Sequence, residues 1–150
     1  MKLFYHHIEK IVAVSKGVAD DILSITKLPP DRVLVVSNPV VTPRVYSMAR
    51  GAIPHPWLGE PGIPVIIGAG RLTKQKDFTT LIRVFAAVRK KRDCRLVILG
   101  EGEQRGILVS LAASLGVMDN FYMPGFVTNP YSWLARCSLF VLSSKWEGSS

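Results

Sequence analysis

Glu147 is the first candidate for chemistry, because it follows an apolar run near the end of the sequence. Residues 138–150 read SLFVLSSKWEGSS, which places Glu147 in a Trp-Glu-Gly turn. In an open α/β sheet, ligands bind at the carboxyl ends of the strands, so an acid directly after a strand can face a ligand. We predict that Glu147 and the adjacent Gly148 belong to a binding site. Because the sequence ends just after this turn, we expect the chain to be a fragment of an enzyme.

A second candidate site is the loop at residues 68–76, GAGRLTKQK, which lies between a strand pattern and a helix pattern. Its glycines, Gly70 among them, allow a ligand to approach the backbone closely. Arg71 can hold a phosphate with its planar fork of N–H donors, and Lys74 and Lys76 add positive charge. The unpaired amides at the start of the next helix also favour an anion. This loop therefore predicts a phosphate site.

Two further loops with glycines follow strand patterns. Residues 100–106 read GEGEQRG, and their acids, Glu101 and Glu103, favour the start of a helix rather than phosphate binding. Residues 124–130 read PGFVTNP, and we expect their backbone to be available to contact a nucleotide base. All four loops would leave the same edge of one parallel sheet, which brings them together.

Strand and helix patterns alternate along the chain, and this alternation predicts an α/β fold with a Rossmann-like parallel sheet and flanking helices. Most strand patterns are continuous apolar runs, which is typical of strands buried on both faces. The expected strands are residues 10–14, 32–37, 64–69, 95–99, 120–123 and 139–142. The expected helices are residues 16–26, 77–91, 103–115 and 130–135, with Ser15 and Asp77 as N-caps.

The regular alternation stops between the second and third expected strands. This stretch is rich in proline and glycine and shows no clear element, so we interpret residues 41–61 as an interdomain linker. Residues 1–40 would then be the tail of one Rossmann-like domain, and residues 62–150 the first part of another.

The chain is basic, with a net charge of +8 and a pI near 9.8. Phosphates, nucleic acids and anionic membranes are the partners that such a charge favours. No His, Cys and carboxylate spacing is typical of a metal site. Without an apolar run of about 20 residues or a signal-peptide pattern, we expect a cytoplasmic protein.

Six short segments together resemble the family 4 type glycosyltransferases, which are retaining enzymes with the GT-B fold. They cover nearly the whole chain in the order of the family: IVAVS at 11–15, VLVVSNP at 33–39, GRLTKQKD at 70–77, LVILGEG at 96–102, PGFV at 124–127 and LFVLSSKWEG at 139–148. The resemblance implies that the chain is an incomplete GT-B fold whose second domain binds a nucleotide-diphosphate sugar.

The resemblance also implies roles for individual residues. Arg71 and Lys76 would hold the donor diphosphate and stabilise the charge of the leaving group. The backbone at Phe126 and Val127 would contact the base, and Glu147 would bind hydroxyls of the transferred sugar. No metal or other cofactor is implied. The expected donor-binding residues also include two glycines, Gly70 next to Arg71 and Gly148 next to Glu147 in the sequence.

The family resemblance implies sugar transfer with retention of the anomeric configuration. It leaves open whether the acceptor is a glycan, a lipid-linked or a small-molecule compound. Because most of an acceptor domain is absent, we expect the 150-residue chain alone to be inactive. Peripheral contact with the inner face of an anionic membrane stays open, and no nucleic-acid partner is expected.

Two other functions remain as alternatives. One is a nicotinamide-dependent Rossmann oxidoreductase, although Thr73 stands where the third glycine of that fingerprint would lie and no acidic ribose-binding residue follows. The other is a non-enzymatic basic module that binds anionic membranes or nucleic acid.

Overall fold

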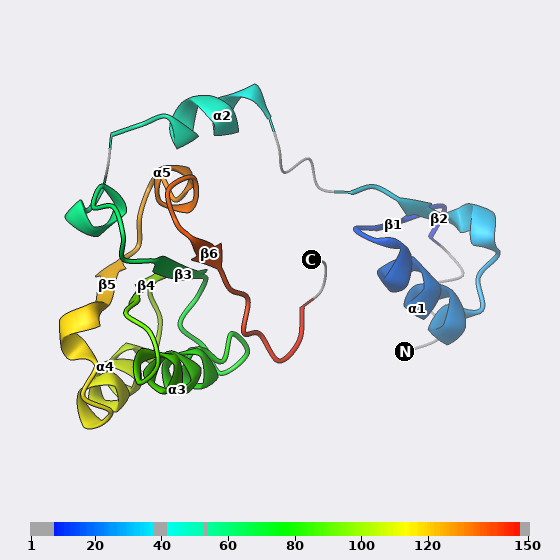
Figure 1. Ribbon diagram of the computed structural model, residues 1–150. Coiled ribbons are helices and arrows are strands. Elements are labelled where there is room, and N and C mark those ends of the chain that lie inside the picture. The colour runs from blue at the N-terminus through cyan, green and yellow to red at the C-terminus, as the bar shows by residue number, and fades with distance from the viewer. Residues whose placement is uncertain (1–7, 38–41, 53, 148–150) are drawn as a thin grey trace. The chain divides into compact units, whose positions relative to one another are not determined.

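The chain forms two compact units in the computed structural model (Figure 1). The structure describes three stretches of the sequence, residues 8–37, 42–52 and 54–147. The first unit falls within residues 1–42 and 147–150, and the second unit comprises residues 43–146. Residues 38–41, which include the first residue of the expected linker, and Gly148 of the expected binding site lie outside the described residues.

The first unit pairs two short parallel strands and packs one helix beside them. Ser15 caps this helix as expected, since its Oγ accepts a hydrogen bond from the Val18 N–H at 3.3 Å. The elements are β1 (Ile11–Ala13), α1 (Lys16–Thr26), the 3-10 turn Pro30–Arg32 and β2 (Val33–Val35).

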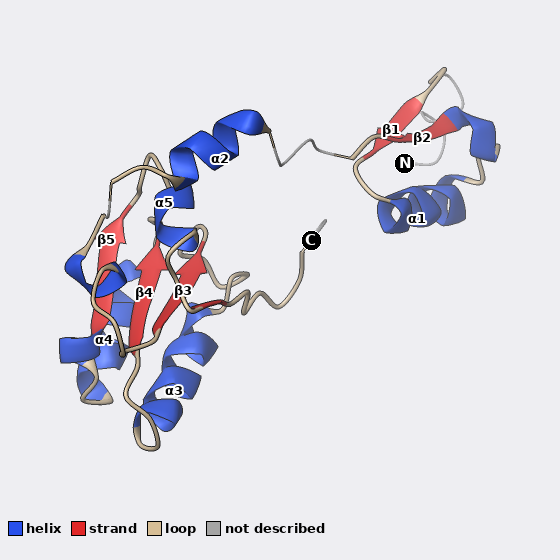
Figure 2. Ribbon diagram, turned by 45° about the horizontal axis from the view of Figure 1, so that its top comes forward, coloured by secondary structure: helices blue, strands red, loops and turns tan. Residues whose placement is uncertain are grey.

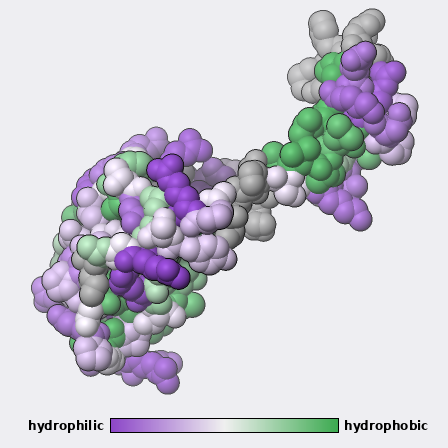
Figure 3. All heavy atoms as spheres, turned by 90° about the horizontal axis from the view of Figure 1, so that it is seen from above, coloured by the Kyte–Doolittle hydropathy of each residue, from purple (hydrophilic) through white to green (hydrophobic). Residues whose placement is uncertain are grey.

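Strand side chains in the first unit are more exposed than expected. Val12 is 60% exposed and Leu34 is 46% exposed, whereas we expected burial on both faces. Apolar side chains are visible at the surface of this unit in Figure 3. The reason is that α1 covers only one side of a two-stranded sheet, where Ala13 is buried.

The second unit contains a four-stranded, entirely parallel sheet in the order β5-β4-β3-β6. Its strands are β3 (Val65–Ala69), β4 (Arg95–Leu99), β5 (Phe121–Gly125) and β6 (Leu139–Phe140). The chain moves outward from β3 to β5 and then returns to place β6 on the other side of β3. This reversal is the kind of switch point at which open α/β sheets bind ligands.

Helices cover both faces of this sheet (Figure 2). Alternate residues of β4 explain why: Leu96 and Ile98 pack with α3 and α4, and Val97 and Leu99 pack with Trp133 of α5. The helices are α2 (Pro43–Ala49), α3 (Phe78–Arg89), α4 (Arg105–Ser114) and α5 (Tyr131–Leu134), with 3-10 turns at Pro56–Leu58 and Met118–Asn120. None of the helices in the described part of the chain is long and apolar enough to span a membrane.

Residues 43–49 differ from our expectation that residues 41–61 lack regular structure, because they form helix α2. Pro43 is tolerated at the first helical position, where its missing N–H costs nothing. Arg136 then binds the far end of the helix, donating to the carbonyls of Ala49 and Gly51 at 3.0 and 2.6 Å. The segment from residue 43 onward is therefore folded with the second unit, and the division into residues 1–40, 41–61 and 62–150 stays a prediction about domains.

The start of α3 also differs in detail from the prediction. Asp77 has a left-handed backbone with φ +46° and makes no side-chain bond to a backbone N–H of the helix. Its Oδ2 instead accepts a hydrogen bond from the Thr80 hydroxyl at 2.8 Å. The expected cap is therefore replaced by a bond between two side chains.

His55 lies in an aromatic cluster on the segment that precedes β3. Its Nδ1 accepts a hydrogen bond from the Trp57 N–H at 3.3 Å, and its ring lies 4.5 Å from that of Tyr122. Burial and then the positive charge of Arg95 lower the pKa of His55, with Glu60 opposing them. This part of the unit therefore favours a neutral imidazole.

Candidate functional site

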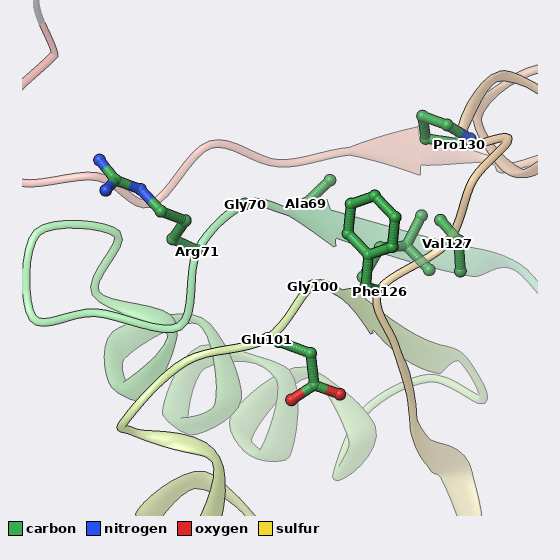
Figure 4. Close-up of a pocket in the computed structure, with 9 residues that line it drawn as sticks. Ala69, Gly70, Arg71, Gly100, Glu101, Phe126, Val127 and Pro130 are labelled. Carbon is green, nitrogen blue, oxygen red and sulfur yellow. The ribbon is translucent and has the colours of Figure 1, made fainter.

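The loops that follow β3, β4 and β5 meet in a cavity of about 460 Å³ (Figure 4). They come together because parallel strands place their carboxyl ends at one edge of the sheet. The lining residues are Ala69, Gly70, Arg71, Leu99, Gly100, Glu101, Phe126, Val127 and Pro130. Most of this wall is apolar or glycine, with one cation and one acid.

The β3 and β4 loops pack backbone against backbone. The Gly70 N–H donates to the Leu99 carbonyl at 3.0 Å, and the Leu72 N–H donates to the Glu101 carbonyl at 2.9 Å. A Cβ atom at Gly100 would overlap the Gly70 carbonyl oxygen, and the Gly100 φ of +134° is itself rare for other residues. The cavity floor therefore requires glycine at position 100.

Of the two predicted phosphate-binding cations, Arg71 lines the cavity and Lys76 is not among the lining residues. Arg71 is exposed, with its guanidinium extending away from Phe126 in Figure 4. Lys76 is half-buried, and its aliphatic chain lies beside Gly70, where an added Cβ would be 3.3 Å from Lys76 Cε. Lys74 instead lines a smaller cavity of about 150 Å³ near the start of α3. Both predicted phosphate-binding cations are thus associated with the β3 loop that forms the main cavity.

Phe126 and Val127 form the apolar wall of the cavity. Phe126 is 76% exposed, and Val127 packs against the core beneath α5. Figure 4 shows the Phe126 ring beside Ala69 and Val127. An exposed aromatic ring beside an aliphatic surface suits a flat, partly apolar ligand group.

The segment after β6 is bonded to the β3 loop. The Ser143 hydroxyl donates to the Lys76 carbonyl at 2.8 Å, the Lys145 N–H to the Gln75 carbonyl at 2.8 Å, and the Gln75 amide to the Trp146 carbonyl at 2.9 Å. These bonds fix the chain as far as Trp146. Glu147 is exposed and is not among the residues that line the cavity, so its contact with a sugar stays a prediction.

Glu101 lines the cavity, whereas we expected another role for it. We expected it to favour the start of α4, but that helix begins only at Arg105, and Glu101 lies on the cavity wall. Its position directly after a strand, between two glycines, was the signal available in the sequence. Among the described residues, no group of three or more His, Cys, Asp or Glu side chains could hold a metal ion.

Comparison with known proteins agrees with this arrangement. Residues 56–150 match the family model described as Glycosyl transferases group 1. A curated relative from Campylobacter jejuni is 31% identical over the whole of this chain. It is the N-acetylgalactosamine-N,N'-diacetylbacillosaminyl-diphospho-undecaprenol 4-alpha-N-acetylgalactosaminyltransferase. The chain spans 39% of the length of that relative.

Solved structures share the fold at lower identity. TarM of S. aureus, in a complex that includes UDP, superposes with a TM-score of 0.74 at 19% identity, covering 97% of this chain and 27% of TarM. HepE of Anabaena in complex with UDP gives a TM-score of 0.71 at 17% identity, covering 92% of this chain and 39% of HepE. The α/β sheet with flanking helices is thus part of a GT-B architecture. With the family model matching well over half of its length, this chain belongs to the group 1 glycosyl transferases.

Proposed function

We propose that the full-length protein transfers a sugar from a nucleotide-diphosphate sugar to an acceptor with retention of the anomeric configuration. In this proposal, residues 62–150 are the first part of the donor-binding domain, and their cavity holds the nucleotide. The observation that carries the proposal is the cavity at the carboxyl ends of β3, β4 and β5, which combines a glycine floor, Arg71 and an apolar wall. The UDP present in the TarM and HepE structures supports a nucleotide ligand.

In this proposal, different residues bind different parts of the donor. The backbone at Phe126 and Val127 contacts the base, and Arg71 and Lys76 bind the diphosphate. As the bond between the anomeric carbon and the diphosphate oxygen breaks, negative charge builds on the leaving phosphate, and these cations stabilise it. Glu147 orients the sugar by accepting hydrogen bonds from its hydroxyls. The acceptor hydroxyl oxygen forms the new bond to the anomeric carbon, and its proton passes to the departing diphosphate oxygen.

The acceptor in this proposal is a glycan, a lipid-linked compound or a small molecule. The name of the Campylobacter jejuni relative includes a diphospho-undecaprenol compound, which supports a lipid-linked acceptor without selecting one here. The charge of +8 supports a cytoplasmic protein that contacts an anionic membrane surface peripherally. Because Arg71 and Lys76 would offset the diphosphate charge, the proposed reaction uses no metal cofactor.

The two alternative functions are not favoured. The matching family model and the curated relatives are glycosyltransferases, not nicotinamide-dependent oxidoreductases or membrane-binding or nucleic-acid-binding modules. Thr73 also interrupts the dinucleotide fingerprint in the β3 loop.

Calorimetry on the full-length protein tests the proposal, with UDP, GDP and ADP as probes. We expect at least one of the three to bind, and we expect transfer from a matching nucleotide sugar to be detectable with a mixed glycan and lipid acceptor extract. Absence of binding to all three would contradict the proposal. The 150-residue chain alone should show no transfer from the same donors, because it contains only part of the relatives' length.

A further inference from the structure

Glu101 places a negative charge on the wall of a cavity that we propose to hold a diphosphate. An unpaired carboxylate there would repel the ligand. In Figure 4, its carboxylate is turned away from the Phe126 ring. The structure shows what holds it: Arg105 Nη1 donates to Glu101 Oε1 at 3.2 Å. A positive charge therefore accompanies the acid at the cavity.

Arg105 also binds the strand that carries the apolar wall. Its Nη2 donates to the Met123 carbonyl at 2.9 Å, two residues before Gly125 ends β5. Gly125 has φ +95°, and a Cβ atom there would overlap Glu101 Oε1. The Gly125 carbonyl accepts from the Gly100 N–H at 2.8 Å. One guanidinium thus joins the first residue of α4 to the loop after β4 and to strand β5.

We propose that Arg105 is a positioning residue of the nucleotide site, which makes the cavity able to accept a diphosphate. It holds the Glu101 carboxylate aside and offsets its charge. This inference rests on the proposed function of the cavity. It goes beyond that function because it assigns an electrostatic role to a residue that does not line the cavity.

A double-mutant cycle read by calorimetry on the full-length protein tests this role. The probes are the tightest binder among UDP, GDP and ADP, and the corresponding nucleoside, which has no phosphate. Arg105→Gln should weaken diphosphate binding about threefold to tenfold, since the pair is part-exposed and solvent screens it. Nucleoside binding should change by less than about twofold, because an uncharged ligand does not sense the exposed acid.

Adding Glu101→Gln to Arg105→Gln should restore most of the diphosphate affinity, because it removes the uncompensated charge. Arg105→Lys should stay within about threefold of wild type, since it keeps the positive charge near the acid. The deficit of Arg105→Gln should also shrink in high salt, as expected for an exposed charge. With a purely structural role, neither Glu101→Gln nor high salt would restore the lost affinity.

Arg89→Gln is the matched control. Arg89 pairs with Asp93 in the same i,i+4 arrangement at 3.1 Å and also donates to a backbone carbonyl, that of Cys94, but it lies at the end of α3 away from the cavity. It should leave both affinities unchanged. If wild type binds but the double variant is no better than Arg105→Gln, or nucleoside binding falls as much as diphosphate binding, the role of Arg105 is refuted. If wild type binds none of the diphosphates, the proposed function fails and the inference fails with it.

Discussion

Replacing Gly100 with alanine should both destabilise the second unit and abolish nucleotide binding. The Gly100 φ of +134° is a conformation that other residues rarely adopt, and holding alanine there costs about 1–3 kcal/mol. The new methyl group would also overlap the Gly70 carbonyl oxygen, so the β3 loop must move. That movement breaks the bond from the Gly70 N–H to the Leu99 carbonyl, worth about 0.5–1.5 kcal/mol. We expect a total loss of about 2–4 kcal/mol in the free energy of unfolding.

Urea unfolding of the full-length protein, followed by calorimetry with a nucleoside diphosphate, measures both effects. Gly106→Ala is the matched control, because Gly106 lies within α4 and an added Cβ meets no atom within 4 Å. It should stabilise the protein by about 0.5–1 kcal/mol, since alanine favours helix more than glycine does. If Gly100→Ala unfolds like wild type and binds the nucleotide normally, our account of the packed loops is wrong.

Three further predictions concern charged and titratable residues. In the full-length enzyme, Arg71→Ala and Lys76→Ala should each slow transfer roughly 30- to 1,000-fold, which corresponds to about 2–4 kcal/mol in the transition state. Lys74→Ala should slow transfer less. Steady-state kinetics measure all three variants, and unchanged rates for the first two would refute the phosphate assignment. Glu147→Gln should reduce turnover and leave the affinity for the bare nucleoside diphosphate nearly unchanged. If calorimetry finds that a correctly folded variant no longer binds the nucleoside diphosphate, the assignment of Glu147 to the sugar site is wrong. Burial and a neighbouring guanidinium lower the pKa of His55 below 6.5, so the unfolded chain takes up the proton more readily. Stability should then be full well above pH 6.5 and fall as the pH drops through that value, and His55→Gln should flatten this part of the stability profile.

The sequence predicted the sheet of the second unit well, because its strands carry an unambiguous signal. Residues 96–99 are apolar at consecutive positions, and the structure buries Leu96 and Val97 on opposite faces of the sheet. The same kind of run at residues 33–35 does not guarantee burial, since Leu34 remains 46% exposed in a sheet of two strands. An apolar run predicts a strand, but its burial depends on which neighbours are present.

Helix α2 depends on contacts with distant residues, which the local sequence cannot reveal. Proline and glycine in this segment favoured a linker, yet the helix forms and its last carbonyls accept hydrogen bonds from Arg136. The Met48 carbonyl also accepts a hydrogen bond, from the Asn129 side-chain amide at 2.9 Å. Both partners lie more than 80 residues away in the sequence, so no window around the segment reveals them.

For the candidate site too, some features could be predicted from the sequence and others could not. Gly70, Arg71, Phe126 and Val127 meet at the cavity because strand ends can be located from the sequence, and parallel strands bring their ends together. The charge of the cavity could not be predicted in this way. Glu101 read alone is an acid that should repel phosphate, and only the folded chain shows that a guanidinium on the next helix accompanies it. Whether an acid opposes or permits anion binding is therefore a property of a pair of residues, and in this pair Arg105 is also held to β5 through its bond to the Met123 carbonyl.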